Sequence, residues 1–197
     1  PFSLPYEKQM RLFALAAENR VPWYKNLEDE RAFFKRYYRA MLREEGVTED
    51  LDARAETLFA ALWCNHDRLL YPEVVGVLES LCAKGYRLGV ISDTSPSLEY
   101  TLRQLGVARY FTSFTASSLV GVGKPDPRIY NAALRAQGAT AGESLYVDDC
   151  EAEAEGARRL GFTAFHLDRS GRAEGRWTVT DLTQLIRFVE ESENAGR

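Results

Sequence analysis

From residue 71 onward, short apolar runs alternate with stretches whose apolar residues have helical spacing. The apolar runs predict strands at residues 87–91, 111–118, 144–147 and 163–167. Helices are expected near residues 96–105, 127–136, 152–160 and 181–189. Consecutive parallel strands need a long crossover, which usually contains a helix, so this alternation predicts a parallel sheet with helices on both faces. We therefore expect a three-layer α/β/α core over residues 71–197.

The first part of the chain carries helical patterns only. Apolar residues recur at i, i+3, i+4 and i+7 in two places: Met10, Phe13, Ala14 and Ala17, then Ala55, Leu58, Phe59 and Leu62. An aromatic-rich stripe between them predicts a helix over residues 28–46. Three basic residues that interleave with this stripe are interpreted as a solvated helix face rather than a substrate site: Lys35, Arg36 and Arg39. A small helical bundle is expected over residues 1–70.

Composition narrows the class of protein. A chain of 197 residues that is 45% hydrophobic can bury a core. A net charge of −4 disfavours binding to nucleic acid or to an anionic membrane surface. The apolar runs all stay below the roughly 20 residues that a membrane-spanning helix needs. Three cysteines without CxxC spacing disfavour a disulfide framework or a zinc site and suit a reducing cytoplasm. The oligomeric state stays open.

Polar side chains stand where three elements of the predicted sheet end. Ser92 follows the strand at 87–91, Lys124 lies in the Gly- and Pro-rich turn GVGKPDP, and Asp148 and Asp149 follow the strand at 144–147. Carboxyl ends of parallel strands meet at one edge of a sheet, where ligands of such folds bind. A hydroxyl, an ammonium and two carboxylates are suited to hold a phosphate and its Mg²⁺, as donor, counter-charge and metal ligands.

Each of these residues also has an ordinary structural interpretation. Asp149 precedes a predicted helix and is a candidate N-cap. The Ser92 hydroxyl and the backbone amides after it are suited to receive a phosphate at a helix N-terminus, but Ser92 taken alone is more typical of a turn or a cap. Lys124 taken alone is typical of an exposed loop. The occurrence of all three sites at one edge of the predicted sheet favours the phosphate interpretation.

Three segments together resemble the haloacid dehalogenase-like (HAD) hydrolase superfamily over nearly the whole chain. They are LYPEVVGVLESLCAKGYRLGVISDTS, GVGKPDPRIYNAAL and SLYVDDCEAEAEGARRLGF, in the order and at the spacing of that family. The resemblance implies a Rossmann-like core with a parallel sheet and a mobile helical cap before Tyr71.

The resemblance also implies roles for the strand-end residues. Ser92 is similar to the family's phosphate-binding hydroxyl, and Asp93 beside it joins the phosphate-binding set. Lys124 is similar to the lysine that steadies the nucleophile and the phosphate. Asp149 matches the acid that binds Mg²⁺, with Asp148 beside it as a second metal ligand. Two positions depart from the family's pattern: Asp93 stands where many members carry asparagine, and Glu153 where Asp or Asn is common.

The family's nucleophile motif, similar to DxDGT at the end of a first strand, is absent from the sequence. The DxD match Asp50-Leu51-Asp52 lacks the Gly-Thr turn and is interpreted as the start of a helix. In the family the first strand lies mid-sheet, between the strands that in this chain end at Ser92 and Asp148. Without it, two strand edges would face a gap with unpaired backbone groups.

Two explanations account for the absent nucleophile motif. We expect that the natural protein has an upstream segment that supplies the strand and the aspartate, and that residues 1–197 alone are inactive. Alternatively, the flanking strands pair directly and the protein is a catalytically inactive binding or regulatory module.

For the intact protein we expect a Mg²⁺-dependent phosphatase that forms an aspartyl phosphate and acts on a small phosphorylated metabolite. A 2-haloacid dehalogenase-type hydrolase is the alternative within the same family. No nucleic-acid or membrane partner is expected.

Overall fold

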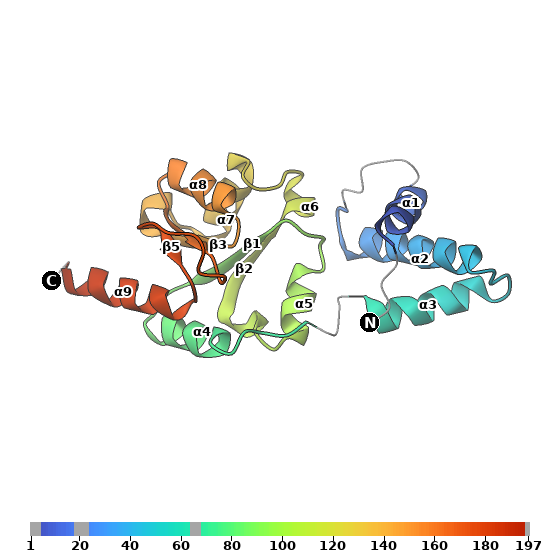
Figure 1. Cartoon of the computed structure of the whole chain (residues 1–197), viewed down its shortest axis with the longest axis horizontal. Coiled ribbons are helices and arrows are strands. Elements are labelled where there is room, and N and C mark those ends of the chain that lie inside the picture. Colours follow the sequence, from blue (N-terminus) through green and yellow to red (C-terminus); the bar gives the residue numbers. More distant parts are fainter. Residues whose placement is uncertain (1–4, 18–23, 64–67, 196–197) are drawn as a thin grey trace.

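A computed structural model describes residues 5–17, 24–63 and 68–195 of the chain. Its elements form two groups: a helical region at the start of the chain and an α/β body after it (Figure 1). The helical region comprises α1 (Tyr6–Ala16), α2 (Leu27–Glu44) and α3 (Leu51–Leu62). The strands of the body are β1 (Leu88–Ser92), β2 (Phe111–Ala116), β3 (Leu145–Asp148), β4 (Thr163–Leu167) and β5 (Thr178–Val179). Its α-helices are α4 (Val74–Ala83), α5 (Leu98–Gln104), α6 (Ser117–Val120), α7 (Pro127–Gln137), α8 (Glu151–Arg159) and α9 (Thr183–Ala195), and its short 3₁₀ helices are η1 (Ala108–Tyr110) and η2 (Ala141–Glu143).

The helical region packs through aromatic side chains of α2, which lies between α1 and α3. Phe33 and Tyr38 are buried, as the predicted stripe on this helix requires. The stripe predicted on α1 is partly wrong, because Met10 is 44% exposed whereas Leu12 and Ala16 are buried. The helix packs on α2 along one narrow side, so it buries one i, i+4 pair and leaves part of the predicted face in solvent.

The body has the predicted α/β fold with parallel strands. Figure 1 shows α7 and α8 on one side of the strands and α4, α5 and α9 on the other. The described strands form two separate sheets, divided at the place where a gap is expected without the family's first strand. β1 pairs with β2, and β3 pairs with β4, which pairs with β5. The sequence pattern does not predict β5, because its two residues follow a polar, Gly-rich loop and form no apolar run.

The two sheets are divided between β1 and β3, and in the described part of the chain these strands do not pair with each other. The described residues therefore lack the direct pairing of flanking strands that an inactive module would use. Every residue of β1 is at least partly exposed, and Leu145 of β3 is 37% exposed. Strands in the middle of an α/β sheet are normally covered on both faces, so β1 and β3 are less covered than such strands usually are.

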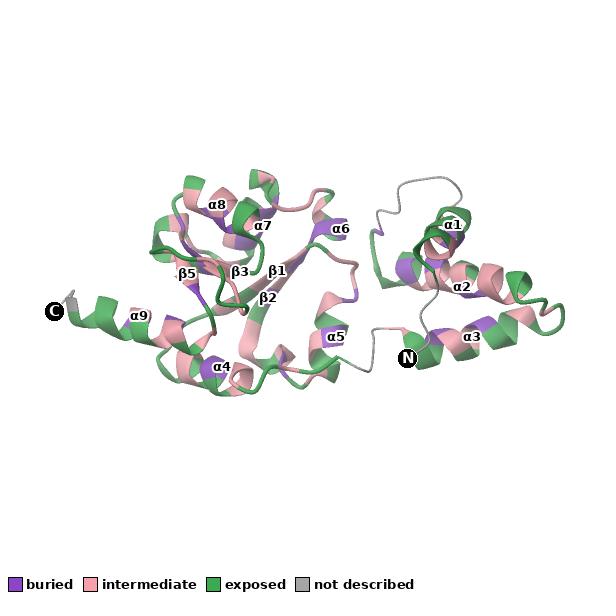
Figure 2. Cartoon of the chain, viewed as in Figure 1, coloured by how far each residue is buried: buried purple, intermediate pink, exposed green. Residues whose placement is uncertain are grey.

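Helix α7 holds the two sheets together. It contacts β1, β2 and α8. Its residues Ile129 and Tyr130 are fully buried in a cluster with Tyr146 of β3 and Phe162, and Ile91 of β1 packs against the same cluster. Figure 2 shows this buried surface of α7 turned inward. The strand ends of both sheets are thus positioned by one shared core.

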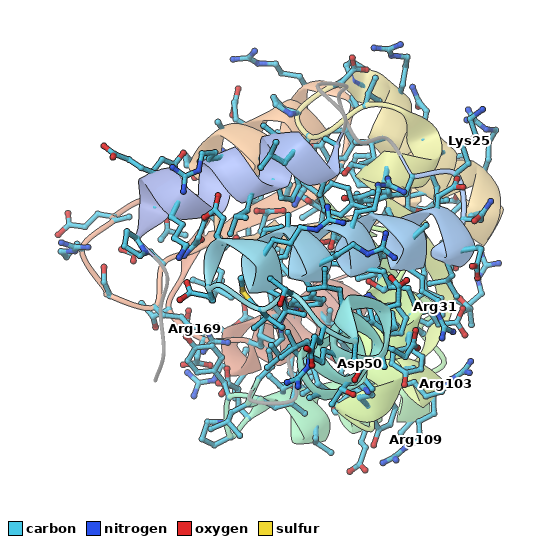
Figure 3. All side chains as sticks on the ribbon, turned by 90° about the vertical axis from the view of Figure 1, so that its right-hand side faces the viewer. Lys25, Arg31, Asp50, Arg103, Arg109 and Arg169 are labelled. Atoms are coloured by element: carbon cyan, nitrogen blue, oxygen red, sulfur yellow. The ribbon has the colours of Figure 1, made fainter. Side chains whose placement is uncertain are left out.

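The Asp50-Leu51-Asp52 match lies at the start of α3 as predicted, but the Asp50 side chain makes no capping hydrogen bond. Asp50 occupies the N-cap position of α3, with Leu51 as the first helical residue. It lies on the end of the helical region that faces the viewer in Figure 3, which is the end turned away from the α/β body. Within the described ranges, no helix is long and apolar enough to cross a membrane.

Candidate functional site

A buried carboxylate at the end of β3 is the centre of the candidate site. The Asp148 side chain is 5% exposed, and Lys124 Nζ lies 2.7 Å from its Oδ2. The same oxygen accepts a hydrogen bond from the Tyr146 hydroxyl, and Oδ1 accepts one from Cys150 N–H at 2.9 Å. Burial raises the pKa of Asp148, but the hydrogen bonds from Lys124 and Tyr146 outweigh it and hold the pKa below its usual value.

Lys124 is held between two carboxylates. Its Nζ also lies 2.6 Å from Glu153 Oε2 of α8, and its side chain is 9% exposed. Burial lowers the pKa of Lys124, yet the hydrogen bonds to Asp148 and Glu153 outweigh burial and leave the pKa raised. Burial and the charge of Asp148 raise the pKa of Glu153 against the opposing effect of Lys124. The Lys124 ammonium is therefore charged and buried, and its two carboxylate partners fix its position.

Local sequence explains how the loop brings Lys124 to this place. Asp126 caps α7 by accepting the Arg128 N–H at 2.9 Å, and Pro127 is the first helical residue, as the sequence predicts. On the other side of the loop, a Cβ at Gly156 of α8 would lie 2.7 Å from Pro125 Cβ. The glycine lets the loop approach α8 closely.

Asp93 joins this loop to the end of β1. Its two carboxylate oxygens accept hydrogen bonds from Lys124 N–H at 3.0 and 3.1 Å. A Cβ at Gly123 would lie 3.0 Å from Asp93 Oδ2, so a larger residue there would crowd the carboxylate. Hydrogen bonds thus connect Asp93, Lys124 and Asp148 across the division between the two sheets.

Ser92 and Asp149, the other two predicted site residues, lie at the end of β1 and directly after β3. Ser92 is the last residue of β1, opposite Ala116 of β2, and is partly exposed. Asp149 is exposed and follows Asp148 directly. It is not a helix cap, because α8 begins at Glu151 with Cys150 at the N-cap position.

The helix predicted near residues 96–105 is present as α5, with a loop between it and Ser92. Helix α5 begins only at Leu98. The backbone N–H and hydroxyl of Ser97, which precedes it, both donate to Glu30 of α2. These donors are used by the helical region, so a phosphate at Ser92 would rely on the loop that follows β1.

Tyr146 and Glu153 belong to the site, although sequence patterns do not assign them to it. Tyr146 reads as an apolar strand residue, yet it stands two positions before Asp148 and so shares its face of the strand. The two-residue spacing between Tyr146 and Asp148 is therefore the sequence signal that could assign Tyr146 to the site. Glu153 stands out in the sequence only as a departure from the family's pattern. Its position in the first turn of α8, facing the Lys124 loop, is not visible from local sequence.

The described residues suit a magnesium ion only in part. Asp149 offers an exposed carboxylate, which is a ligand of the right kind. Both oxygens of Asp148 already accept hydrogen bonds, and one of them is paired with Lys124. No group of three or more His, Cys, Asp or Glu side chains suited to a metal occurs among the described residues. Further ligands would have to come from elsewhere.

A pocket of about 380 Å³ lies where the helical region meets the body, beside Asp93. Its lining residues are Phe13, Tyr24, Phe34, Asp93, Thr94, Ser95, Ser117, Ser118 and Gly123. A larger hollow of about 460 Å³ lies between α2 and α3, lined by Arg39 and Asp52, which form an ion pair. It is remote from the strand ends, so we assign the candidate site to the smaller pocket.

Comparison with characterised proteins agrees with this architecture. The haloacid dehalogenase-like hydrolase family matches residues 6–161. The chain is 33% identical over 153 residues to a phosphoserine phosphatase of Thermus thermophilus, covering 76% of this chain and 60% of that protein. It is 30% identical over 150 residues to an (S)-2-haloacid dehalogenase of a Pseudomonas species, covering 72% of this chain and 63% of that protein. The chain thus spans about three fifths of the length of these relatives.

Solved structures share the fold. A 2-haloacid dehalogenase from Pseudomonas syringae superimposes with a TM-score of 0.72 at 25% identity, covering 96% of this chain and 82% of that one. A HAD phosphatase from Thermococcus onnurineus superimposes with a TM-score of 0.65 at 23% identity, covering 93% of this chain and 80% of that one. The chain belongs to the haloacid dehalogenase-like hydrolase family.

Proposed function

We propose that the intact protein is a Mg²⁺-dependent phosphatase that acts on a small phosphorylated metabolite through an aspartyl phosphate. The observation that carries the proposal is the buried Lys124 ammonium, which is fixed between Asp148 and Glu153. The residue before it, Gly123, and its backbone partner Asp93 both line the pocket. A buried cation that is held in place before substrate binds can stabilise the negative charge of a transferring phosphoryl group without reorganisation.

The other site residues receive roles from their positions. The Ser92 hydroxyl, at the end of β1, binds a phosphate oxygen. Asp93 holds the Lys124 loop through its carboxylate and adds its backbone N–H to the phosphate site. Residues 1–70 act as a cap over the core formed by residues 71–197.

We further propose that the nucleophilic aspartate comes from a strand that lies between β1 and β3 and is not supplied by these 197 residues. The division of the sheet at this place supports the proposal, as do the incompletely covered residues of β1. An extra parallel strand would satisfy the open backbone groups of both edges and place its own end beside Lys124. Without that strand, the chain would lack phosphatase activity.

Asp149 is the proposed magnesium ligand of this chain. The sequence alone assigns Asp148 to the metal as well, but its bond to Lys124 supports a role in positioning the lysine instead. When bound, the ion would supply positive charge to the phosphate oxygens. Cytoplasmic location remains a prediction.

A 2-haloacid dehalogenase is the second candidate function. The 30% identity to an (S)-2-haloacid dehalogenase and the 25% identity to a structure of that class support it. The incomplete set of metal ligands among the described residues fits this alternative as well, because displacement of a halide by a carboxylate nucleophile needs no metal.

The test compares the protein expressed from its complete coding sequence with residues 1–197 alone. Both are assayed with 4-nitrophenyl phosphate and Mg²⁺, and with 2-chloropropionate by chloride release. Phosphate release by the longer protein alone supports the phosphatase and the missing strand. Chloride release without phosphate release supports the dehalogenase. No turnover of either substrate by either protein supports the inactive module.

Lys124→Met in the longer protein tests the role of the lysine. We expect kcat to fall by at least ~100-fold, as for removal of a preorganised charge from a transition state. Lys84→Met is the matched control, because Lys84 pairs with Glu190 and Glu193 of α9, away from the site. Similar kcat values for the two variants would contradict the assigned role.

A further inference from the structure

One wall of the pocket is aromatic and comes from the helical region. Phe13, Tyr24 and Phe34 line it. Behind them lies Phe33, which is 1% exposed and packs against all three rings with centroid distances of 4.6, 5.3 and 5.3 Å. This shared support fixes the orientation of the rings, so the wall is a preformed apolar surface.

The opposite wall comes from the body and is polar without being cationic. It carries the hydroxyls of Thr94, Ser95, Ser117 and Ser118 and the carboxylate of Asp93. The Ser118 Oγ is buried and has no hydrogen-bond partner among the described residues, and Ser118 as a whole is 9% exposed. Buried hydroxyls normally have partners, so this one is available to a polar group that enters the pocket.

The described lining of the pocket contains no lysine, arginine or histidine. Four basic side chains of α1 and α2 pair with carboxylates that are not part of the lining. Arg11 pairs with Glu44, Arg31 and Lys35 pair with Glu56, and Arg39 pairs with Asp52. The Arg36 guanidinium donates to the carbonyl of Ala16 and is not part of the lining, although its charge acts on Tyr24 from behind the aromatic wall, against the opposite effect of Glu30. A carboxylate in the pocket would meet the negative charge of Asp93 and aromatic rings, and no cationic side chain among the described lining residues would pair with it.

We infer that the pocket takes the uncharged, apolar or aromatic alcohol portion of a phosphate monoester and rejects alcohols that carry a carboxylate. This inference rests on the proposed phosphatase function for the identity of the substrate's phosphate. Burial of an unpaired carboxylate is costly, and like charge at Asp93 adds to the cost. The substrate class thus differs from phosphoserine, whose phosphatase is among the relatives, because phosphoserine carries a carboxylate.

The test uses two esters that differ in one carboxylate placed away from the reacting atoms. Benzyl phosphate and 4-carboxybenzyl phosphate are compared as substrates of the protein expressed from its complete coding sequence. We expect kcat/KM to be at least ~10-fold higher for benzyl phosphate, which corresponds to ~1.4 kcal/mol. Equal values, or a preference for the carboxylate, would overturn the inference while leaving the phosphatase function intact.

A variant with an added cation gives a second readout. Phe34→Lys places an ammonium on the aromatic wall and should lower the ratio of the two kcat/KM values by ~10-fold, because the lysine can pair with the carboxylate. Leu15→Lys is the matched control, because Leu15 is 56% exposed on α1 and is not part of the lining. It should leave the ratio unchanged. If Phe34→Lys does not fold, the substrate comparison on the unaltered protein decides.

Binding separates this inference from the proposed function. The non-hydrolysable benzylphosphonate and 4-carboxybenzylphosphonate are titrated into the same protein by calorimetry. Tighter binding of benzylphosphonate with no turnover of either ester would support the pocket and contradict the phosphatase. Failure of benzylphosphonate to bind more tightly than its carboxylated partner would overturn the inference.

Discussion

Glu30 of α2 and Ser97 of the body are joined by two hydrogen bonds, from Ser97 N–H at 2.9 Å and from its hydroxyl at 2.7 Å. Glu30 is 2% exposed, and its carboxylate also accepts a bond from Trp63 Nε1 at 3.1 Å. The Trp63 ring is stacked between Phe59 and Tyr100, each with a centroid distance of 4.8 Å. These contacts attach the helical region to the body beside the pocket.

Glu30→Ala should lower the free energy of unfolding by about 3 kcal/mol, because the buried donors of Ser97 and the partly buried Trp63 Nε1–H lose their acceptor. Urea unfolding followed by tryptophan fluorescence measures the change. Glu28→Ala, on an exposed position of the same helix, is the control and should change stability by less than about 0.5 kcal/mol. Equal losses for the two variants would show that the buried contacts contribute nothing to stability.

Gly156→Ala should destabilise the protein by about 1–3 kcal/mol, because the new Cβ would meet Pro125 Cβ at 2.7 Å. The same substitution at Gly76 of α4 is the matched control, since a Cβ there meets nothing within 4 Å. Gly76→Ala should stabilise by up to about 1 kcal/mol through helix propensity alone. Thermal or urea unfolding measures both, and stabilisation by both substitutions would rule out the proposed close approach.

Tyr146→Phe should destabilise the protein by about 1–2 kcal/mol, because Asp148 loses a buried donor. The pKa of Asp148 should rise, since the hydroxyl favours its charged form. Carboxyl NMR titration and urea unfolding measure these effects. In the control Tyr86→Phe, the lost bond to Glu193 is exposed, and the change should stay below about 0.5 kcal/mol. An unchanged Asp148 pKa in the Tyr146 variant would contradict the geometry.

Asp126 should titrate at a pKa of about 2, chiefly because its carboxylate accepts hydrogen bonds from the Arg128 side chain and N–H. A lowered folded-state pKa contributes stability above the unfolded value of about 3.9, and this stability is lost as pH falls toward about 2. Asp126→Asn keeps a cap acceptor but removes the charge. The stability difference from the unaltered protein should therefore shrink between pH ~4 and ~2 in urea unfolding.

Arg128→Gln supplies the control for this pH dependence. In that background the Asp126 pKa should move back toward its ordinary value, and the Asn substitution should show a weaker pH dependence over the same interval. A pH dependence that is identical in both backgrounds would mean that Arg128 is not the cause.

Local patterns are sufficient to predict the main elements of the body. The strand predicted at residues 163–167 coincides with β4, and the Asp126-Pro127 pair begins α7 as expected. Apolar runs and cap residues act within one element, so they can be recognised from neighbouring residues. Strand β5 and the buried side of α1 are not predictable in this way, because pairing and packing with distant residues decide them.

The candidate site is predictable as a set of residue types at strand ends, but not as a set of contacts. Ser92, Asp93, Lys124, Asp148 and Asp149 follow from their places after strands and in a turn, together with the family resemblance. The structure adds that Lys124 is bonded to Asp148 and Glu153 and that Asp93 holds the backbone of Lys124. Which donor satisfies a buried carboxylate depends on how separate elements approach each other.

The amino-acid sequence by itself determined an α/β protein with helices at its start, because hydrophobic periodicity reports which face of each element is buried. Only the tertiary structure decided that β1 and β3 do not pair with each other in the described chain, that Tyr146 and Glu153 join the site, and that Glu30 binds Ser97. These features depend on contacts between residues far apart in the chain, which form only when the core around α7 brings the elements together.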